Sequence, residues 1–232
     1  MIVDDDMMVR EVLTLLAADA GFEVAAFEDG ESALEAIAAA TSDCPGIVLV
    51  DMQMPGISGD SFARLLRRAC GAGTKLLAMS GTEVPADRIS AFDGFLLKPF
   101  SMDDVLAALE NTPQAAAPVS EVDSALNRTI YDSFANGMPA DQLAKLYALS
   151  LDDADARIEI MRQAVDADDQ EAYRRAAHSI KGGCGMVGAT ELAKLASAME
   201  EEGFTIVDNK GPLQQFLTAS AHLRRILDAL RK

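Results

Sequence analysis

Side chains suited to phosphoryl chemistry follow four of the five short apolar runs in the first half of the chain. In chain order they are Asp4, Asp5, Asp51, Ser80 and Lys98. Clustered carboxylates repel one another unless a hard cation joins them, and Mg²⁺ binds through oxygen ligands. One carboxylate can attack phosphorus if the cation, a hydroxyl and an ammonium neutralise the phosphoryl oxygens. The pattern indicates Asp51 as the nucleophile, Asp4 and Asp5 as Mg²⁺ ligands, and Ser80 and Lys98 as phosphate-binding residues.

A second candidate, His178, lies in a helical pattern of the second half. One helical stripe is apolar and predicts a core face: Tyr173, Ala177, Ile180, Cys184 and Val187. The other stripe must face outward: Arg174, His178, Lys181, Gly182 and Gly185. An outward imidazole can accept a phosphoryl group, and Lys181, one turn on, can steady it. Glycine costs about 1 kcal/mol relative to alanine inside a helix, so the glycines indicate a surface kept bare for a partner.

The elements that position these residues differ between the two halves. The first half alternates strand and helix patterns, which predicts a parallel sheet covered on both faces. The expected strands are Ile2–Val3, Glu23–Phe27, Gly46–Val50, Lys75–Met79 and Gly94–Leu97. The helical patterns between them lie near 7–20, 30–40, 58–70, 85–91 and 101–110. Because the carboxyl ends of parallel strands share one edge, the phosphoryl-binding residues should meet there.

The second half has no strand pattern. After a proline- and alanine-rich linker at 112–120, helical patterns occupy 121–135, 140–166, 169–187, 189–202 and 211–231. Long helices joined by short turns predict an antiparallel four-helix bundle. We therefore expect an α/β domain at 1–111 and an all-α domain at 121–232.

Composition excludes several classes. The net charge of −17 disfavours nucleic acid and anionic lipid as partners, and no apolar run is long enough to span a membrane. The cysteines, Cys44, Cys70 and Cys184, lie far apart without metal-ligand spacing, and their odd number favours a reducing cytosol over a disulfide framework. We expect a cytoplasmic location. Cys184 is interpreted as core, His222 as structural or merely exposed, and the Glu200–Glu202 run as a solvated helix end.

Residues 1 to about 111 resemble the receiver domain of two-component response regulators, on the acidic pair, the lone Asp51, Ser80 and Lys98-Pro99. The resemblance implies a flavodoxin-like, doubly wound five-stranded sheet of order 2-1-3-4-5, Mg²⁺ dependence and an acyl phosphate at Asp51. It also implies that the Gln53 backbone oxygen binds the metal, that the Lys98–Pro99 peptide is cis, and that Phe95 is the switch aromatic. Asp6 matches a variable position and is interpreted as a helix N-terminal acid. The interval from Ser80 to Lys98 is short for this family, so its helix should be short or irregular.

Residues 121–232 resemble the histidine phosphotransfer (HPt) domain, on the segment His178-x-x-Lys-Gly-Gly-x-x-x-x-Gly. That family is a four-helix bundle with an exposed phosphorylatable histidine and no kinase activity. Together the resemblances imply a phosphorelay intermediate that is not itself an enzyme. A histidine kinase would phosphorylate Asp51, and His178 would exchange phosphoryl with a receiver aspartate in the same or another chain. The order of the domains matches the C-terminal part of hybrid histidine kinases, so the parent could be a membrane-bound sensor kinase of which this is a cytoplasmic part.

An enzyme and a pure interaction module are the two alternative classes of protein. An ATP-using kinase would need a glycine-rich nucleotide segment that the chain lacks, and a haloacid-type phosphatase would need an aspartate where Gln53 stands. A pure interaction module, in which phosphorylation of Asp51 only gates access to His178, stays open on sequence grounds.

Overall fold

The computed structural model describes residues 1–39, 44–110, 125–204 and 211–230. The chain divides into two compact units, Met1–Ala117 and Pro118–Lys232. The linker expected at 112–120 lies outside the described residues, as do the first residues of the helix expected from 121 and the last ones expected for the helices ending at 40 and 231. In the described part, no helix is both long and apolar enough to cross a membrane.

The first unit is built on a parallel five-stranded sheet of order β2-β1-β3-β4-β5, as predicted. The central strand β3 is almost wholly buried, as expected for a strand covered on both faces. Val48 and Val50 of β3, with Phe62 and Leu66 of α3, form part of the hydrophobic core. The strands are β1 (Ile2–Val3), β2 (Ala26–Phe27), β3 (Ile47–Asp51), β4 (Lys75–Ser80) and β5 (Gly94–Leu97).

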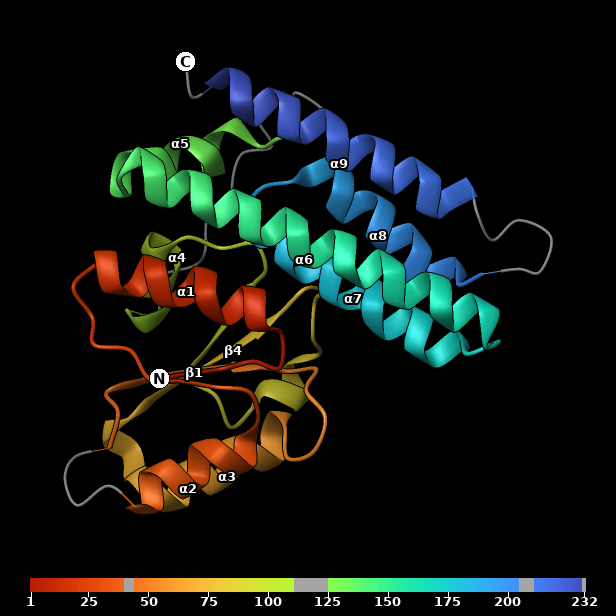
Figure 1. Cartoon of the computed structure of the whole chain (residues 1–232). Helices are drawn as coiled ribbons and strands as arrows, with labels where there is room; N and C mark the ends of the chain where they lie inside the picture. The colour runs from red at the N-terminus through yellow and green to blue at the C-terminus, as the bar shows by residue number, and fades with distance from the viewer. Residues whose placement is uncertain (40–43, 111–124, 205–210, 231–232) are drawn as a thin grey trace. The chain divides into compact units, whose positions relative to one another are not determined.

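Helices cover both faces of this sheet. In Figure 1, α1 and α4 lie on one side of it, and α2 and α3 on the other. The bounds are α1 (Met7–Asp19), α2 (Gly30–Ala39), α3 (Gly59–Cys70) and α4 (Met102–Leu109). Between β4 and β5 stands only a 3₁₀ turn, η2 (Ala86–Ile89), which confirms the short, irregular fourth helix. A second 3₁₀ turn, η1 (Gly71–Gly73), follows α3. β2 is shorter than expected from Glu23–Phe27, because the pairing with β1 covers only Ala26 and Phe27.

The second unit is a helix bundle, also as predicted. The helices are α5 (Arg128–Gly137), α6 (Ala140–Asp166), α7 (Gln170–Met186), α8 (Thr190–Glu202) and α9 (Gly211–Leu230). The four long helices close a ring, since α6 packs on α7, α7 on α8, α8 on α9, and α9 on α6. The connections from α6 to α7 and from α7 to α8 are each three residues long, which makes those neighbours antiparallel. The stripe predicted to form the core is buried from Tyr173 to Val187.

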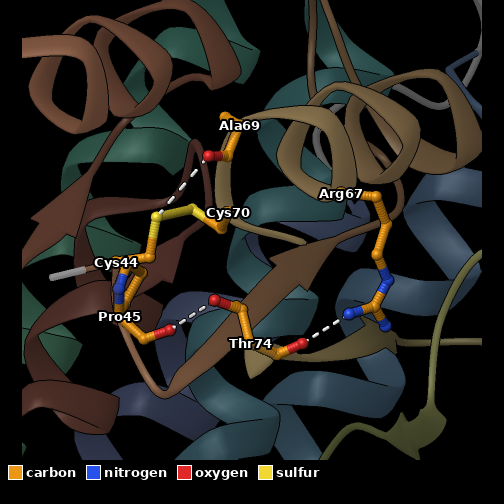
Figure 2. The surroundings of a disulfide bond; sticks show 6 residues. All are labelled: Cys44, Pro45, Arg67, Ala69, Cys70 and Thr74. Carbon is orange, nitrogen blue, oxygen red and sulfur yellow. Dashed lines mark hydrogen bonds between the residues drawn. A yellow bond between two sulfur atoms is a disulfide. The ribbon is translucent and has the colours of Figure 1, made fainter. Parts of the chain in front are cut away.

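The expectation that the cysteines form no disulfide is wrong, because Cys44 and Cys70 are joined by one (Figure 2). Their Cα atoms lie 5.5 Å apart across a sequence separation of 26 residues. β3 runs to the carboxyl edge of the sheet, and α3 runs back, so the end of α3 returns beside the start of β3. This crossover brings together two residues that are distant in the sequence. The argument from unpaired cysteines to a reducing compartment therefore falls.

Replacing Tyr147 by Phe should lower the free energy of unfolding of the bundle by about 1–3 kcal/mol. Tyr147 is 1% exposed, and its hydroxyl donates a 2.7 Å hydrogen bond to the backbone carbonyl of Val187. Phenylalanine has no hydroxyl, so the carbonyl of Val187 would lose this donor. Chemical denaturation of the two proteins measures the difference. The matched control is Tyr131→Phe, at a half-buried ring that lies tilted against the Tyr147 ring, and this change should alter stability much less. Equal losses in the two variants would contradict the role of the hydroxyl.

Candidate functional sites

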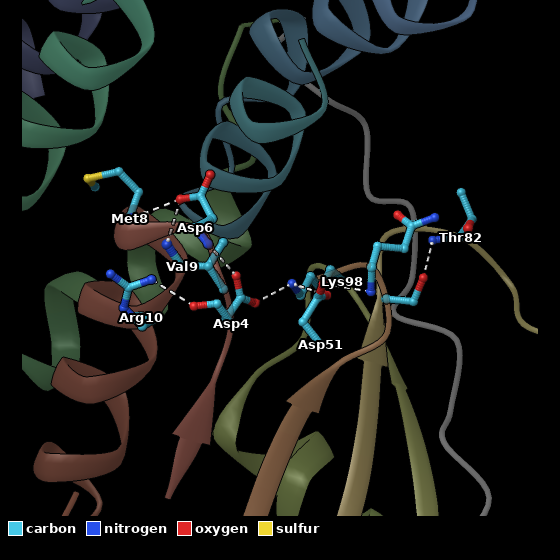
Figure 3. Close-up of polar contacts among 10 residues, drawn as sticks. Asp4, Asp6, Met8, Val9, Arg10, Asp51, Thr82 and Lys98 are labelled. Carbon is cyan, nitrogen blue, oxygen red and sulfur yellow. Dashed lines mark hydrogen bonds and ion pairs between the residues drawn. The ribbon is translucent and has the colours of Figure 1, made fainter. Parts of the chain in front are cut away.

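The carboxyl edge of the sheet brings the acids and Lys98 together, as the sequence predicts. Asp51 ends β3, Asp4 follows β1, and Lys98 follows β5. The Lys98 ammonium donates to Asp4 Oδ2 at 2.6 Å and to Asp51 Oδ1 at 2.8 Å. Figure 3 shows Asp4 and Asp51 converging on Lys98 at the strand ends. The peptide between Lys98 and Pro99 is cis, as the resemblance implied.

Burial gives this cluster its electrostatic character. Asp4 is 1% exposed and Asp51 5%. Burial raises the pKa of Asp4, the Lys98 ammonium lowers it, and Asp51 raises it again, to about 7 in total. Burial acts to lower the pKa of Lys98, but the two carboxylates outweigh it and raise that pKa above its ordinary value. The lysine is therefore held as a cation between two acids that repel each other.

The other predicted residues take different positions around this cluster. Asp5 is largely exposed, but partial desolvation beside the cluster and the charge of Asp51 raise its pKa. The backbone N–H of Gln53 donates to Asp51 Oδ2 at 2.8 Å, which fixes the loop that follows the strand. Ser80 is 1% exposed, and its hydroxyl accepts a 3.2 Å hydrogen bond from the backbone of Thr82. Phe95 is half-buried on β5.

Asp6 caps helix α1, which confirms its interpretation as a helix N-terminal acid. Its side chain accepts hydrogen bonds from the backbone N–H groups of Met8 and Val9 at 2.8 and 3.2 Å. Asp4 in turn accepts from the backbone of Asp6 at 2.9 Å, and Arg10 donates to the Asp4 carbonyl at 2.7 Å. The start of α1 thus holds Asp4 in position at the edge of the sheet (Figure 3).

The donor set fits Mg²⁺ with water completing its coordination. Among the described residues, no group of three or more His, Cys, Asp or Glu side chains forms a cage that could hold a metal ion. Mg²⁺ is ordinarily held by one or two carboxylates and retains several waters, so such a cage is unnecessary. Burial and, to a lesser degree, the charge of Asp51 raise the pKa values of Asp4 and Asp5, and an added cation would favour the ionised form of both carboxyl groups.

The histidine of α7 makes contact with an acid on α8 that the sequence analysis missed. His178 Nδ1 lies 2.6 Å from Glu200 Oε1, and the Lys181 ammonium donates to Glu200 Oε2 at 3.0 Å. Arg174 donates to the Glu200 backbone carbonyl at 3.0 Å. The His178 side chain is 36% exposed, so part of the ring is reachable from solvent.

Glu200 is therefore not part of a solvated helix end, and that prediction is wrong for this residue. Burial opposes its ionisation, but the hydrogen bonds from His178 and Lys181 lower its pKa to about 2. Glu201 and Glu202 are exposed, as expected. The sequence holds one signal for the pairing, without fixing the register: His178 stands ten residues before Gly188 and Glu200 twelve after it, and two antiparallel helices bring such positions near each other.

The remaining residues of this half lie as predicted. Gly185, two helical turns after His178, is half-buried, and a Cβ placed there would meet no atom within 4 Å. The surface beside the histidine is therefore open at this glycine. Cys184 is buried on the core side of α7, and His222 is exposed on α9.

Comparison with known families agrees with this geometry. Residues 1–110 match the family described as the response regulator receiver domain, and residues 145–232 match the Hpt domain. The chain is a receiver domain followed by an Hpt domain. Both are phosphotransfer modules and not ATP-binding catalytic domains.

Curated relatives resemble one or both domains. The sensor histidine kinase AruS of Pseudomonas aeruginosa is 26% identical over 210 residues, which covers 87% of this chain and 20% of AruS. The response regulator MprA of Mycolicibacterium vanbaalenii is 31% identical over 122 residues, 51% of each chain. This chain spans about half the length of the response regulators it matches.

Solved structures resemble each domain separately. The chemotaxis protein CheY4 of Vibrio cholerae is 27% identical, with a TM-score of 0.41, over 48% of this chain and 94% of that protein. The histidine-containing phosphotransfer protein B of Pseudomonas aeruginosa is 25% identical, with a TM-score of 0.43, over 47% of this chain and 96% of that protein.

Replacing Glu200 by Gln should destabilise the bundle at neutral pH and have little effect near pH 2. The folded pKa of about 2 lies below the ordinary 4.5, so the carboxylate stabilises the folded state above pH 4.5. This contribution disappears as the pH falls from 4.5 towards 2, because in this range the unfolded state binds a proton at this residue more readily than the folded state does. Denaturation of both proteins across this pH range measures the effect. Glu202→Gln, on the same helix end and exposed, is the control and should follow the wild type. A pH-independent difference would contradict the ion pairing.

Proposed function

We propose that the chain is a phosphorelay intermediate with two phosphoryl carriers, Asp51 and His178. Asp51 accepts phosphoryl from a histidine kinase. His178 exchanges phosphoryl with a receiver aspartate, in this chain or another. The observation that carries the proposal is the pair of contacts at the sheet edge, where Lys98 bridges Asp51 and Asp4 at 2.8 and 2.6 Å.

At the first site, an Asp51 oxygen attacks the phosphorus of a phosphohistidine. The new O–P bond forms as the P–N bond breaks, and the departing imidazole nitrogen keeps the electron pair. Lys98, already a cation beside Asp51, and the Ser80 hydroxyl receive the phosphoryl oxygens. Bound Mg²⁺, held by Asp5, Asp51, Asp4 and the Gln53 backbone oxygen, would neutralise charge that builds on those oxygens. Phe95, three residues before Lys98, is the proposed switch aromatic, whose position would change on phosphorylation.

At the second site, Glu200 sets which ring nitrogen of His178 reacts. A carboxylate 2.6 Å from Nδ1 favours a proton on that nitrogen, which puts the ring lone pair on Nε2. Nε2 attacks the acyl phosphate of a receiver aspartate, the N–P bond forms, and the aspartate leaves as a carboxylate. Lys181 lies one turn from His178 and offers a positive charge to the phosphoryl oxygens during the exchange.

The comparisons support a histidine kinase and a receiver domain as partners. The match to AruS is long enough to include both domains, and that protein is by name a sensor histidine kinase. The proposal therefore includes a histidine kinase as donor, a receiver domain as acceptor, and a hybrid histidine kinase as the parent if the chain is a piece of one. The cytoplasmic location expected from the sequence stays a prediction.

Asp51→Asn should abolish phosphoryl uptake in the receiver domain. Incubation with a small phosphodonor and Mg²⁺ should give the wild type one base-labile, acid-stable phosphoryl group, as an acyl phosphate requires. Mass spectrometry of the labelled protein measures this. The control, Asp60→Asn, changes an acid of α3 that pairs with Arg64 and should label normally. Label in the receiver half of Asp51→Asn would contradict the assignment.

His178→Gln should abolish acid-labile labelling of the Hpt domain by a phosphorylated receiver, because the attacking nitrogen is gone. Lys181→Ala should slow this transfer without abolishing it, since the lysine binds phosphoryl oxygens and carries no phosphoryl group itself. Transfer is measured by autoradiography of acid- and base-treated samples. His222→Gln is the matched control and should transfer at the wild-type rate. If His178→Gln labels at full speed while His222→Gln does not, the assignment of the carrier is wrong.

Asp5→Ala should weaken Mg²⁺ binding strongly, whereas Gln53→Ala should leave it nearly unchanged. Asp5 would lose a carboxylate ligand, while the alanine at 53 keeps the backbone oxygen. Titration of Mg²⁺ followed by calorimetry measures both affinities. Equal losses in the two variants would show that the Gln53 side chain, and not its backbone, binds the metal.

A further inference from the structure

The disulfide lies at the opposite end of β3 from Asp51. Cys44 is exposed and Cys70 is half-buried, so small thiols can reach the bond. The third cysteine, Cys184, is 1% exposed in the core of the other unit. Thiol–disulfide exchange requires access of a thiolate to one of the sulfurs. The chain therefore offers one accessible pair and one shielded thiol.

The bond closes a covalent ring that contains the proposed phosphoryl acceptor. From Cys44 the ring runs through β3 to Asp51, then through residues 52–58 and along α3 to Cys70. The disulfide thereby joins the start of β3, the strand that ends at Asp51, to the end of α3, the helix that follows it. Opening the bond removes this tie without cutting the chain.

The surroundings accommodate the reduced state as well as the oxidised one. Cys44 Sγ lies 3.8 Å from the carbonyl oxygen of Ala69, in the last turn of α3 (Figure 2). In the disulfide this sulfur has no proton, but a Cys44 thiol can donate to that carbonyl, which the helix itself leaves without an intrahelical donor. The Thr74 hydroxyl also donates to the Pro45 carbonyl at 2.8 Å, and the Lys75 N–H donates to the Gly46 carbonyl at 2.8 Å. These bonds hold the start of β3 against β4 whether or not the disulfide is closed.

Reduction of the disulfide would increase the conformational freedom of the C-terminal end of α3. The helix stops at Gly71, whose φ of 74° is readily adopted only by glycine. Arg67, in the last turn, donates to the Thr74 carbonyl and pairs with Asp93, just before β5 (Figure 2 shows the first contact). The last turn of α3 thus connects the disulfide to β4 and, through Asp93, to the strand that carries Lys98.

We propose that Cys44–Cys70 is a reversible thiol–disulfide exchange site through which a dithiol reductant modulates the receiver domain. The dithiol gives up two electrons and two protons. The S–S bond of the protein breaks to two thiols, and the reductant closes into its own disulfide. The oxidised ring holds α3 against the start of β3, and the reduced form loosens the end of α3 and changes the lifetime of the phosphoryl group on Asp51. This effect on the phosphoryl lifetime rests on the proposed function.

The exchange itself is tested on the whole chain without any phosphodonor. The protein is equilibrated in buffers of graded reduced-to-oxidised dithiothreitol ratio, and free thiols are alkylated and counted by mass spectrometry under native conditions. We expect Cys44 and Cys70 to titrate together, with Cys184 unmodified until the protein is denatured. The receiver melting transition should fall by about 10 °C on reduction while the domain stays folded. If the bond forms in no buffer, opens only in denaturant, or unfolds the receiver when it opens, the proposal is overturned.

The consequence for Asp51 is tested by the decay of base-labile label in oxidised and reduced buffer. Wild type and Cys184→Ser should show a lifetime that differs between the two buffers. Cys44→Ser and Cys70→Ser should each show the reduced lifetime in both. Equal lifetimes for the wild type would overturn the redox proposal and leave the proposed function intact. Absence of label in either buffer, with normal thiol titration, would instead overturn the assignment of Asp51.

Discussion

The sharing of one ammonium between two buried carboxylates is the constraint on which the receiver site depends. Asp4 and Asp51 sit on neighbouring strands, β1 and β3, whose carboxyl ends meet at one edge. An unpaired carboxylate at such depth would take up a proton, and Lys98 limits this by lying between the two. The cation reaches them only because β5 delivers it to the same edge. The carboxylates of Asp4 and Asp51 can therefore be buried because the arrangement of the strands places Lys98 beside them.

The histidine site obeys the same logic with the signs reversed. One carboxylate, Glu200, is shared between an imidazole and an ammonium on the neighbouring helix. Here the acid stays ionised, with a pKa of about 2, because both partners donate to it. Each domain thus uses one charged side chain to orient two polar partners, Lys98 for two carboxylates and Glu200 for an imidazole and an ammonium. In both cases the shared residue comes from an element other than that of the proposed phosphoryl carrier.

Much of this could be predicted from the sequence, because strands and helices leave periodic patterns. The meeting of Asp4, Asp51 and Lys98 and the buried stripe of α7 follow from local patterns combined with the geometry of parallel sheets and helices, whereas the sheet order was implied by the resemblance to receiver domains. Two features did not, and both are pairings across an antiparallel return of the chain. Cys44 meets Cys70 because α3 runs back along β3, and Glu200 meets His178 because α8 runs back along α7. Neither residue is distinctive in its own neighbourhood, so only the register of the two elements identifies the partner.

The ionised state of Glu200 has a consequence for the energy of a phosphorylated His178. A phosphoryl group on the ring would bring two further negative charges close to a carboxylate that remains ionised across the physiological pH range. The repulsion raises the free energy of the phosphorylated bundle relative to the free one, and Lys181 offsets only part of it. If His178 carries the phosphoryl group as proposed, the group-transfer potential of that phosphohistidine would therefore be high. The bundle would hold the phosphoryl group weakly, and the receiver aspartates that exchange it with His178 would determine where the group comes to rest.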